Sequence, residues 1–212
     1  TLSGSTPAIT NSPVGIYPIS VGGQSAPNYT IQYVNGTLTV LAAPLLVTAD
    51  NTNRAYGQPN PGFSATFSGW VNGEDTNVLG GTLVLSSPAQ TNSPVGLYPI
   101  IPEGLTATNY ALSFSNGTLT VSSYALSVTA SNQSRTYGAA NPVLTGSLVG
   151  VQNGDNITAV YATVADTSNP VGTYAITPTL VDPNGKLTNY TVSSTNGTLT
   201  VGAASLGVTA RD

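Results

Sequence analysis

Hydrophobic and polar residues alternate along short stretches of this chain, the pattern of strands that bury one face. Residues 31–34 and 37–40 alternate in this way on either side of Asn35-Gly36. An Asn-Gly pair between two alternating runs is a strong hairpin signal, and a type I′ turn there would pair Tyr33 with Leu38 on an inner face. The pattern predicts a mostly β chain.

The strand pattern returns at a fixed period. The hexapeptide Asn-Gly-Thr-Leu-Thr-Val occurs at residues 35–40, 116–121 and 196–201, and its copies start 81 and then 80 residues apart. Arg54-Ala55-Tyr56-Gly57 returns in the same phase as Arg135-Thr136-Tyr137-Gly138. A repeat of this length indicates a string of small, similar domains. Asn-Tyr pairs keep the same phase, at residues 28–29, 109–110 and 189–190.

We expect four segments from this period. Residues 1–43 (repeat 1) correspond to the C-terminal half of a truncated repeat, and residues 44–123 (repeat 2) and 124–203 (repeat 3) to complete repeats. Residues 204–212 correspond to the first strand of a following repeat, so we expect the chain to be a window cut from a longer array. Because only a few residues separate successive repeats, we expect a semi-rigid array.

One stretch in each complete repeat does not have a strand pattern. Residues 72–81 place Glu74-Asp75 early and Gly80-Gly81 late, as a short helix prefers, and residues 153–160 are their counterpart. A short helix would lay its apolar residues on the open sheet face. A loop that crosses between two sheets is the alternative.

Composition excludes several functional classes. Charged residues make up 6% of the 212 residues, the net charge is −4, and only four residues are Lys or Arg. Nucleic acid is therefore not an expected partner, because phosphate binding needs clusters of basic side chains. No apolar run is long enough for a membrane helix. The chain has no Cys or His, and a Thr-, Asn- and Gly-rich array of this kind is typical of extracellular bacterial proteins.

Several short motifs of repeat 2 form one combined pattern, namely Tyr56-Gly57, residues 69–75, residues 95–98, Asn109-Tyr110 and residues 117–121. Together they resemble the MBG repeat of the Tyr-Gly-X type, a family of very long bacterial secreted and surface-attached proteins that include haemagglutinin-like adhesins. The resemblance implies a β-grasp-like two-layer domain with one short helix, in a stalk or adhesin, and it brings no catalytic residues. An all-β immunoglobulin-like sandwich is the alternative.

Catalytic and metal chemistry find little support in the sequence. Without His or Cys the usual triads and transition-metal sites cannot form. We therefore expect no enzyme activity, no cofactor and no resident metal. Calcium is the one ion considered, through Asp50, Glu74-Asp75 and Asp155, although no acid recurs at the junctions and no Asp-rich calcium loop is present.

Three side chains are candidates for contact with a ligand. Arg54 and Arg135 recur in phase and could bind sugars or acidic ligands, or instead stack on a Tyr ring or hold loop carbonyls. Trp70, the sole Trp, could form a sugar-stacking platform or pack in the core or between domains. Val151 takes its place in repeat 3, so a function that depends on Trp70 would not be shared by every repeat.

Three functions follow from these observations. The first is a non-catalytic stalk or spacer in a long protein of the bacterial surface or extracellular space, whose partners are the neighbouring repeats of the same chain. The second is an adhesive module that binds glycan or a host or neighbour surface by avidity. The third is head-to-tail self-association, in which residues 204–212 of one chain add a strand to residues 1–43 of the next.

Overall fold

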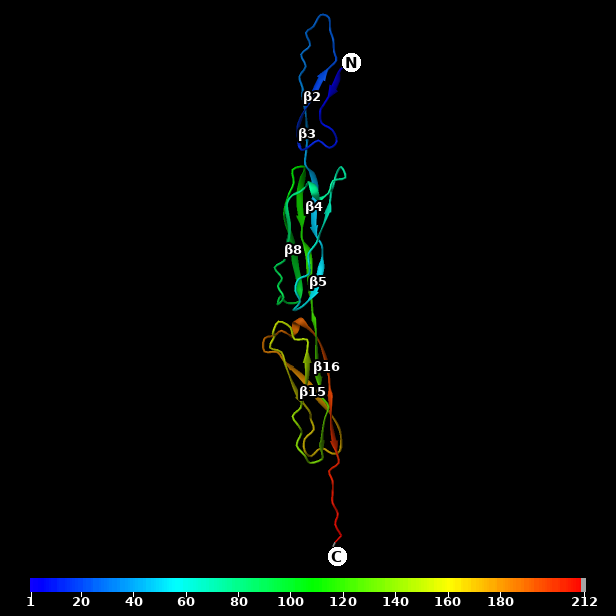
Figure 1. The fold of residues 1–212 in the computed structure, drawn as a ribbon, viewed down its shortest axis with the longest axis vertical. Helices are drawn as coiled ribbons and strands as arrows, with labels where there is room; N and C mark the ends of the chain where they lie inside the picture. Colours follow the sequence, from blue (N-terminus) through cyan, green and yellow to red (C-terminus); the bar gives the residue numbers. More distant parts are fainter. Residues whose placement is uncertain (211–212) are drawn as a thin grey trace. The chain divides into compact units, whose positions relative to one another are not determined.

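The computed structural model describes residues 1–210 and consists mainly of strands, which confirms the predicted mostly β fold (Figure 1). Its contacts divide the chain into two compact units. Unit 1 comprises residues 1–52, 62–88 and 98–119, and unit 2 comprises residues 53–61, 89–97 and the chain from residue 120 onward. The boundary between repeats 1 and 2 lies inside unit 1, and the boundary between repeats 2 and 3 lies inside unit 2.

Repeat 3 lies wholly in unit 2 and forms two sheets. The three-stranded sheet has the order β13 (Gly146–Val149), β11 (Tyr124–Ala130) and β16 (Tyr190–Thr195). The four-stranded sheet has the order β12 (Gln133–Thr136), β17 (Gly197–Gly202), β15 (Gly172–Val181) and β14 (Thr158–Ala162). β11 runs parallel to β16 and β12 runs parallel to β17, while the other neighbours are antiparallel.

The core of repeat 3 lies between these two sheets. Buried and exposed residues alternate on β11, and Ala130 packs in one cluster with Ile176 of β15 and Leu199 of β17. Each fully buried aliphatic side chain contributes roughly 1.5–3 kcal/mol. Strands rather than a helix cover the inner face of each sheet, and residues 1–210 contain no α-helix. The all-β sandwich alternative therefore describes the repeat better than the β-grasp-like unit with a helix.

Unit 1 contains repeat 1 and much of repeat 2. Repeat 1 is an antiparallel sheet in the order β1 (Ser3–Ser5), β2 (Gly15–Gly22) and β3 (Gly36–Val40). Of residues 1–44, all of which the structure describes, none is buried. In repeat 2, β4 (Ala43–Ala49) lies between β6 (Ala65–Ser68) and β9 (Tyr110–Ser115), while β7 (Gly80–Ser86) pairs with β8 (Gly96–Thr106). Within unit 1, Leu45, Val47, Ile100 and Leu119 of repeat 2 are fully buried.

The Asn-Gly pair of the repeated hexapeptide is not a hairpin turn, so that prediction is wrong. At Asn196-Gly197 the chain leaves the three-stranded sheet after β16 and enters β17 of the four-stranded sheet. A type I′ turn needs positive φ at Asn, and Asn196 does not have it. Gly197 serves a close approach instead, since a Cβ there would lie 2.8 Å from the carbonyl oxygen of Ala130. The Thr198 N–H completes the crossing by donating to Asn132 Oδ1 at 2.8 Å.

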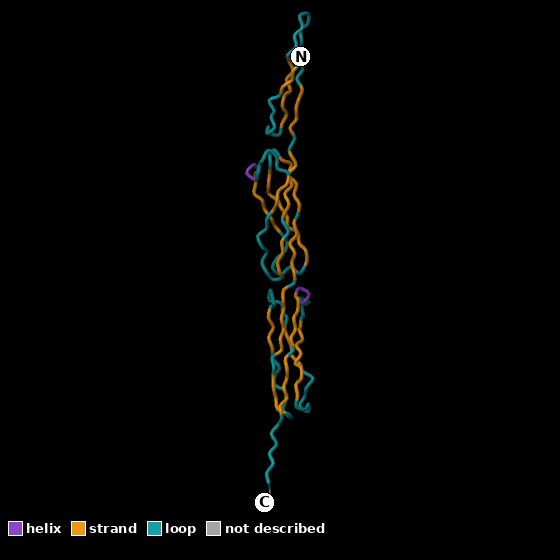
Figure 2. Tube along the Cα trace, turned by 90° about the vertical axis from the view of Figure 1, so that its right-hand side faces the viewer, coloured by secondary structure: helices purple, strands orange, loops and turns teal. Residues whose placement is uncertain are grey.

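The helix expected within residues 72–81 is reduced to η1 (Thr76–Val78), a 3₁₀ turn that is one of the two short helical segments in Figure 2. Asn72-Gly73 forms a tight turn and Gly80 already begins β7, so little chain is left for a helix. Val78 is 45% exposed and does not cover a sheet face. The counterpart, residues 153–160, is a turn followed by β14. No helix in the described residues has the length and apolarity needed to cross a membrane.

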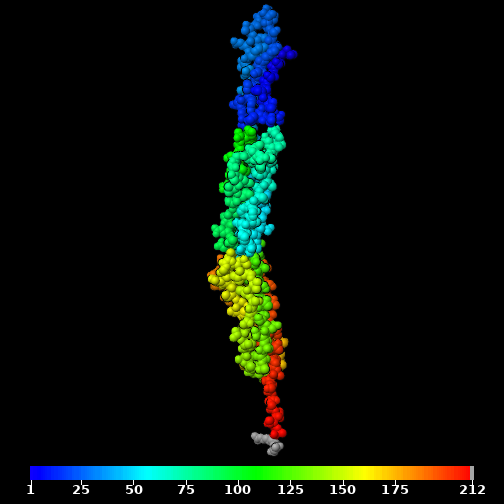
Figure 3. All heavy atoms as spheres, viewed as in Figure 1, coloured from blue at the N-terminus to red at the C-terminus, as the bar shows by residue number. Residues whose placement is uncertain are grey.

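The segment predicted as a first strand, residues 204–212, has no strand in residues 203–210, and Arg211-Asp212 lies outside the described residues. Residues 203–210 follow β17 and form the narrow red tail in Figure 3. Leu206 and Val208 in the tail are 90% and 88% exposed, whereas their counterparts Leu126 and Val128 on β11 are each 1% exposed. The tail therefore carries the alternation of a core strand without a partner sheet.

Candidate functional site

Each complete repeat contains an Asn-Gly turn that ends in an acidic residue. Asn72-Gly73 has φ values of 55° and 72°, and Asn153-Gly154 has φ values of 53° and 68°. Positive φ at both central residues is the type I′ geometry, which Asn and Gly accept most readily. The N–H of Asp155 donates to Gln152 O at 2.9 Å and closes the second turn, which places the Asp155 carboxylate at the end of repeat 3.

Tyr190 holds this turn from within repeat 3. Its hydroxyl receives the Gln152 N–H at 2.9 Å and donates to Asp155 Oδ2 at 2.7 Å. Tyr190 comes from the Asn-Tyr pair that begins β16 and is 7% exposed. Burial, together with the hydrogen bond to Asp155 and its negative charge, raises the pKa of Tyr190 to about 12. The Tyr190 hydroxyl is therefore a donor to Asp155 over the whole physiological pH range.

A second tyrosine reaches the same carboxylate from repeat 2. Tyr56 follows β5 (Thr52–Ala55), is fully buried, and donates its O–H to Asp155 Oδ2 at 3.1 Å. Its ring meets the ring of Tyr190 edge to face, with centroids 5.5 Å apart and planes at 77°. Burial is the main cause that raises the pKa of Tyr56, and Asp155 raises it further. One carboxylate thus joins two tyrosines from consecutive repeats.

Gly57 allows the two repeats to approach this closely. Its φ is +81°, and a Cβ on it would lie 2.6 Å from Gln152 Cβ and 2.7 Å from Gln152 Cγ. Beside it, Gln58 Nε2 donates to Gln152 Oε1 at 3.2 Å. The Tyr-Gly pair therefore has two roles, since Tyr56 supplies the hydroxyl and Gly57 leaves room for Gln152.

A second hydrogen bond between repeats 2 and 3 lies beside the tyrosines. The N–H of Val95 donates to Asn189 Oδ1 at 3.0 Å, and Asn189 is 4% exposed. Asn153 Nδ2 adds a longer bond to Thr91 O at 3.4 Å. The Asn-Tyr pair is therefore used twice, because Asn189 binds the preceding repeat and Tyr190 holds the acid turn. We call these contacts between repeats 2 and 3 the junction.

Part of the same arrangement recurs between repeats 1 and 2, inside unit 1. The N–H of Val14 donates to Asn109 Oδ1 at 3.1 Å, as Val95 does to Asn189. Tyr110 donates to Glu74 Oε2, as Tyr190 does to Asp155. Repeat 1 contains no Tyr-Gly pair to reach Glu74. The contact scheme is thus a property of the repeat and not of one pair of residues.

The motifs that build the junction match a known family. The profile of the MBG domain (YGX type) matches residues 1–39, 45–120 and 126–200. The chain belongs to the MBG domain family. The Tyr-Gly pair of its type is Tyr56-Gly57, which lies in the junction. No curated protein matches the MBG chain.

Two solved structures resemble the MBG chain weakly. One is the crystal structure of Drosophila N-cadherin EC1-3, with a TM-score of 0.27 and 10% identity, covering 92% of this chain and 79% of that one. The other is Drosophila N-cadherin EC1-4, with a TM-score of 0.26 and 9% identity, covering 91% of this chain and 59% of that one. Similarity at this level carries no argument about the fold or function of the MBG repeats.

The two arginines singled out in the sequence hold loops inside their own repeats. Arg54 is 6% exposed and donates to Asn60 Oδ1 at 2.7 Å, to Ala55 O at 3.2 Å and to Gln90 O. Arg135, 8% exposed, makes the equivalent bonds to Asn141 Oδ1, Thr136 O and Asp166 O. This is the loop-carbonyl alternative considered for them. By holding the loop that carries Tyr56, Arg54 positions the junction.

Trp70 lies in unit 1 and is partly exposed. Its ring stacks on Phe67 with centroids 5.6 Å apart and meets Tyr110 edge to face at 5.4 Å. Tyr110 is also the ring that holds Glu74, so Trp70 packs beside the acid turn of repeat 2. These contacts match the packing alternative for Trp70. Contact with a ligand stays a prediction for Trp70, Arg54 and Arg135.

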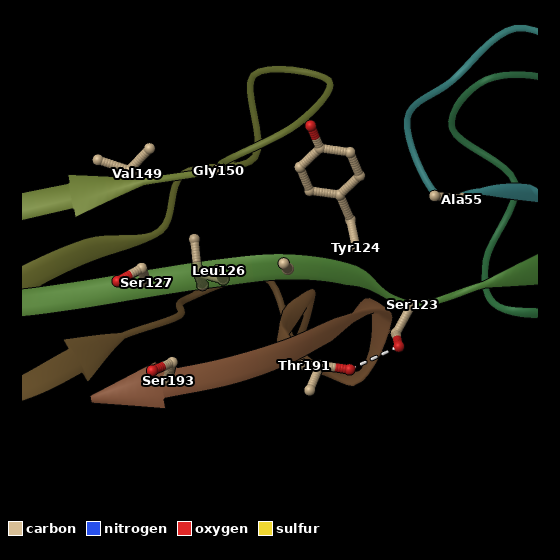
Figure 4. Close-up of a pocket in the computed structure, with 10 residues that line it drawn as sticks. Ala55, Ser123, Tyr124, Leu126, Ser127, Val149, Gly150, Thr191 and Ser193 are labelled. Atoms are coloured by element: carbon tan, nitrogen blue, oxygen red, sulfur yellow. Dashed lines mark hydrogen bonds between the residues drawn. The ribbon is translucent and has the colours of Figure 1, made fainter. Parts of the chain in front are cut away.

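An open groove of about 480 Å³ runs along β11 next to the junction (Figure 4). The Tyr124 ring stands over it, and Ser123 and Thr191 lie at its lower rim with their hydroxyl oxygens 2.6 Å apart. No carboxylate or basic side chain is among its lining residues, all of which the structure describes. Such a groove offers an aromatic face and hydroxyl groups but no acid–base pair.

Metal binding finds no assembled site in the described residues. Among residues 1–210, no three Asp, Glu, His or Cys side chains lie close enough to hold an ion together. Asp155, one of the acids considered for calcium, is hydrogen-bonded to two tyrosines, and Asp50 accepts from Ser64 Oγ at 2.6 Å. The expectation of no resident metal, with calcium as the one ion considered, stays a prediction.

Sequence reasoning did not identify Asp155, Tyr190, Asn189 and Gly57 as partners. A signal for them was present, because the Tyr-Gly pair, the Asn-Gly-acid turn and the Asn-Tyr pair all keep the repeat period. Motifs that recur in phase without forming the core of their own repeat are candidates for contacts between repeats. The sequence does not indicate which of them meet.

Proposed function

We propose that these MBG repeats are non-catalytic spacer modules in the stalk of a long, adhesin-like protein of the bacterial surface or extracellular space. The observation that carries the proposal is the junction, in which Asp155 of repeat 3 accepts hydrogen bonds from Tyr56 of repeat 2 and Tyr190 of its own repeat. Family membership and the sparse charge of the chain, 6% of its residues, support the extracellular setting.

The junction has the properties that a spacer needs. A spacer must limit rotation between its modules, and a short linker alone leaves some freedom. Here a buried ring pair, a shared carboxylate and the Val95–Asn189 bond act at separate points, so rotation between repeats 2 and 3 would break several contacts at once. Hydrogen bonds to a charged group contribute about 1.5–3 kcal/mol each.

Small-angle X-ray scattering of the whole chain tests this function. We expect the wild-type profile to fit a narrow ensemble of arrangements of repeats 2 and 3. The Asp155→Ala variant removes the shared acceptor. Its profile should need a broader ensemble, in which the maximum particle dimension varies over a wider range. A wild-type chain that is as flexible as Asp155→Ala would overturn the spacer function.

The adhesive alternative makes a different prediction for a glycan and host-matrix array, with and without calcium. Spacer repeats should give no saturable signal under either condition. Saturable binding that is lost in Trp70→Ala would make the repeats themselves the adhesive surface. Binding that survives Trp70→Ala but is lost in Tyr124→Ala would assign the adhesion to the groove along β11.

Self-association is a second candidate function, and the exposure of the tail favours it. Leu206 and Val208 are 90% and 88% exposed, although their counterparts on β11 form the core. β11 runs parallel to β16, so the tail of one chain could pair in parallel with residues 29–34 of a second copy. Analytical ultracentrifugation tests this, since Leu206→Ser/Val208→Ser should abolish any concentration-dependent assembly. A strictly monomeric wild-type chain would exclude it.

A further inference from the structure

The far end of repeat 3 is built like the end of repeat 2 that enters the junction. The N–H of Tyr137 donates to Gly202 O at 2.8 Å, as the N–H of Tyr56 donates to Ser122 O at 2.8 Å. Arg135 holds the Tyr137 loop through Asn141 with the same 2.7 Å bond that Arg54 makes to Asn60. The Tyr-Gly loop of repeat 3 is therefore formed and held without any further repeat against it.

The two ends differ in how far other residues bury them. Tyr56 is fully buried, whereas Tyr137 is 49% exposed, and no residue among 1–210 contacts the Tyr137 hydroxyl by a hydrogen bond. A Cβ on Gly57 would collide with Gln152, whereas a Cβ on Gly138 would meet nothing within 4 Å, although φ is +84° there. Val171 is 59% exposed, against 42% for its counterpart Val95. The surface formed by Tyr137, Gly138 and Val171 thus has the donor groups of the junction but no acceptor.

We propose that this surface docks the Asn-Gly-acid turn and the Asn-Tyr pair of a further MBG repeat. This inference rests on the proposed spacer function and identifies its partner chemistry. The partner supplies a carboxylate directly after a type I′ Asn-Gly turn, which accepts the Tyr137 O–H. It also supplies a tyrosine ring edge to face with Tyr137 and an Asn side chain that accepts the N–H of Val171.

The partner half of this contact is also present in the chain, at the end of repeat 2 that contacts repeat 1. There Tyr110 holds Glu74 as Tyr190 holds Asp155, and Asn109 accepts the N–H of Val14. Each complete repeat therefore has a donor end with the Tyr-Gly pair and an acceptor end with the acid turn. Because the two ends differ, contacts of this kind join repeats head to tail, as heterologous interfaces do.

The test uses the full chain and an extended chain in which a second copy of residues 124–203 follows Ala203. Tyr137→Phe is made in both, and Tyr56→Phe serves as the matched control. We expect Tyr137→Phe to leave the unfolding equilibrium of the original chain unchanged. In the extended chain it should shift the equilibrium toward unfolding by about 10- to 100-fold, the size that a lost hydrogen bond to a carboxylate gives. Hydrogen exchange at the N–H of Val171 should slow in the extended chain only.

A double-mutant cycle tests whether the two proposed partners contact each other directly. Tyr137→Phe and an Asp→Asn change at position 155 of the appended copy should be coupled in the extended chain. No coupling, or unchanged exchange at Val171, would overturn the inference. The control distinguishes this outcome from failure of the proposed function. If the contacts between repeats 2 and 3 do not stabilise the chain, Tyr56→Phe would have no effect either.

Discussion

Tyr56 and Asp155 are 99 positions apart in the sequence, and their hydrogen-bonding oxygens are 3.1 Å apart across the junction of two repeats. Tyr56 is fully buried, and its hydroxyl and ring contact Asp155 and Tyr190 of the next repeat. Its counterpart Tyr137, in a loop of the same construction, is 49% exposed. The stability of one end of repeat 2 therefore depends on repeat 3, and the two tyrosines form a natural internal comparison.

Replacing Asp155 by Ala should lower the free energy of unfolding by about 1–3 kcal/mol, because two buried tyrosine hydroxyls lose their acceptor. Urea denaturation followed by tyrosine fluorescence measures this change. Glu103→Ala, at an exposed acid on β8, is the control and should lie within about 0.5 kcal/mol of wild type. Equal effects of the two variants would mean that Asp155 contributes only surface charge.

The stability of the junction should decrease at alkaline pH. The pKa of Tyr190 is about 12 in the fold and near 10 in the unfolded chain, so the folded state holds this proton more tightly. The resulting stabilisation is complete below pH 10 and is lost as the pH rises toward 12. Thermal melts from pH 8 to 12 should show the decline, and Tyr190→Phe should make it shallower. Tyr29→Phe, at an 80% exposed ring, should leave the wild-type slope unchanged.

Gly57→Ala and Gly138→Ala form a matched pair. Both glycines have positive φ, so each Ala carries a backbone penalty of about 1–2 kcal/mol. Only Gly57 faces Gln152, and the added methyl group should push the two repeats apart. We expect the Gly57→Ala variant to melt at a lower temperature than Gly138→Ala. Gln152→Gly, which also removes the Cβ nearest to the added methyl group, should restore part of the difference. If the two glycine variants melt alike, Gly57 has no role in the close approach.

Arg54→Lys and Arg135→Lys should each destabilise the chain by about 1–3 kcal/mol, because Lys cannot reach the Asn side chain and the loop carbonyl together. Arg54→Lys should also loosen the junction, which hydrogen exchange at the N–H of Val95 would detect. Variants that lose binding on a glycan array while keeping wild-type stability would instead show that these arginines contact a ligand.

Local alternation in the sequence predicts the buried face of repeat 2 but not that of repeat 1. Leu119 and Val121, the counterparts of Leu38 and Val40 in repeat 2, are 0% and 1% exposed. In repeat 1 the expected inner-face pair is not buried, because Tyr33 is 40% and Leu38 is 38% exposed there. Asn-Gly pairs do form type I′ turns in this chain, but not in the repeated hexapeptide where they are expected. The turns form at Asn72-Gly73 and Asn153-Gly154. Flanking alternation does not distinguish a hairpin from a crossing between two sheets. That difference depends on which strands pair, which is set by contacts far apart in the sequence.

The junction could not be predicted for a related reason. Tyr56, Arg54 and Asp155 were all visible as in-phase or candidate residues, yet sequence position does not say which end of a domain a loop reaches. Their meeting depends on β5 and the acid turn lying at opposite ends of a repeat, and this follows only from the pairing of its strands. A period of about 80 residues identified the module but not its contact surfaces.

Because every complete repeat carries both a Tyr-Gly end and an acid-turn end, duplication of one repeat in the gene would copy a matched pair of contact surfaces with it. The new repeat would fit its neighbours on both sides without any compensating substitution. An array of this design can lengthen or shorten by whole repeats through recombination, and its reach can therefore evolve faster than its fold.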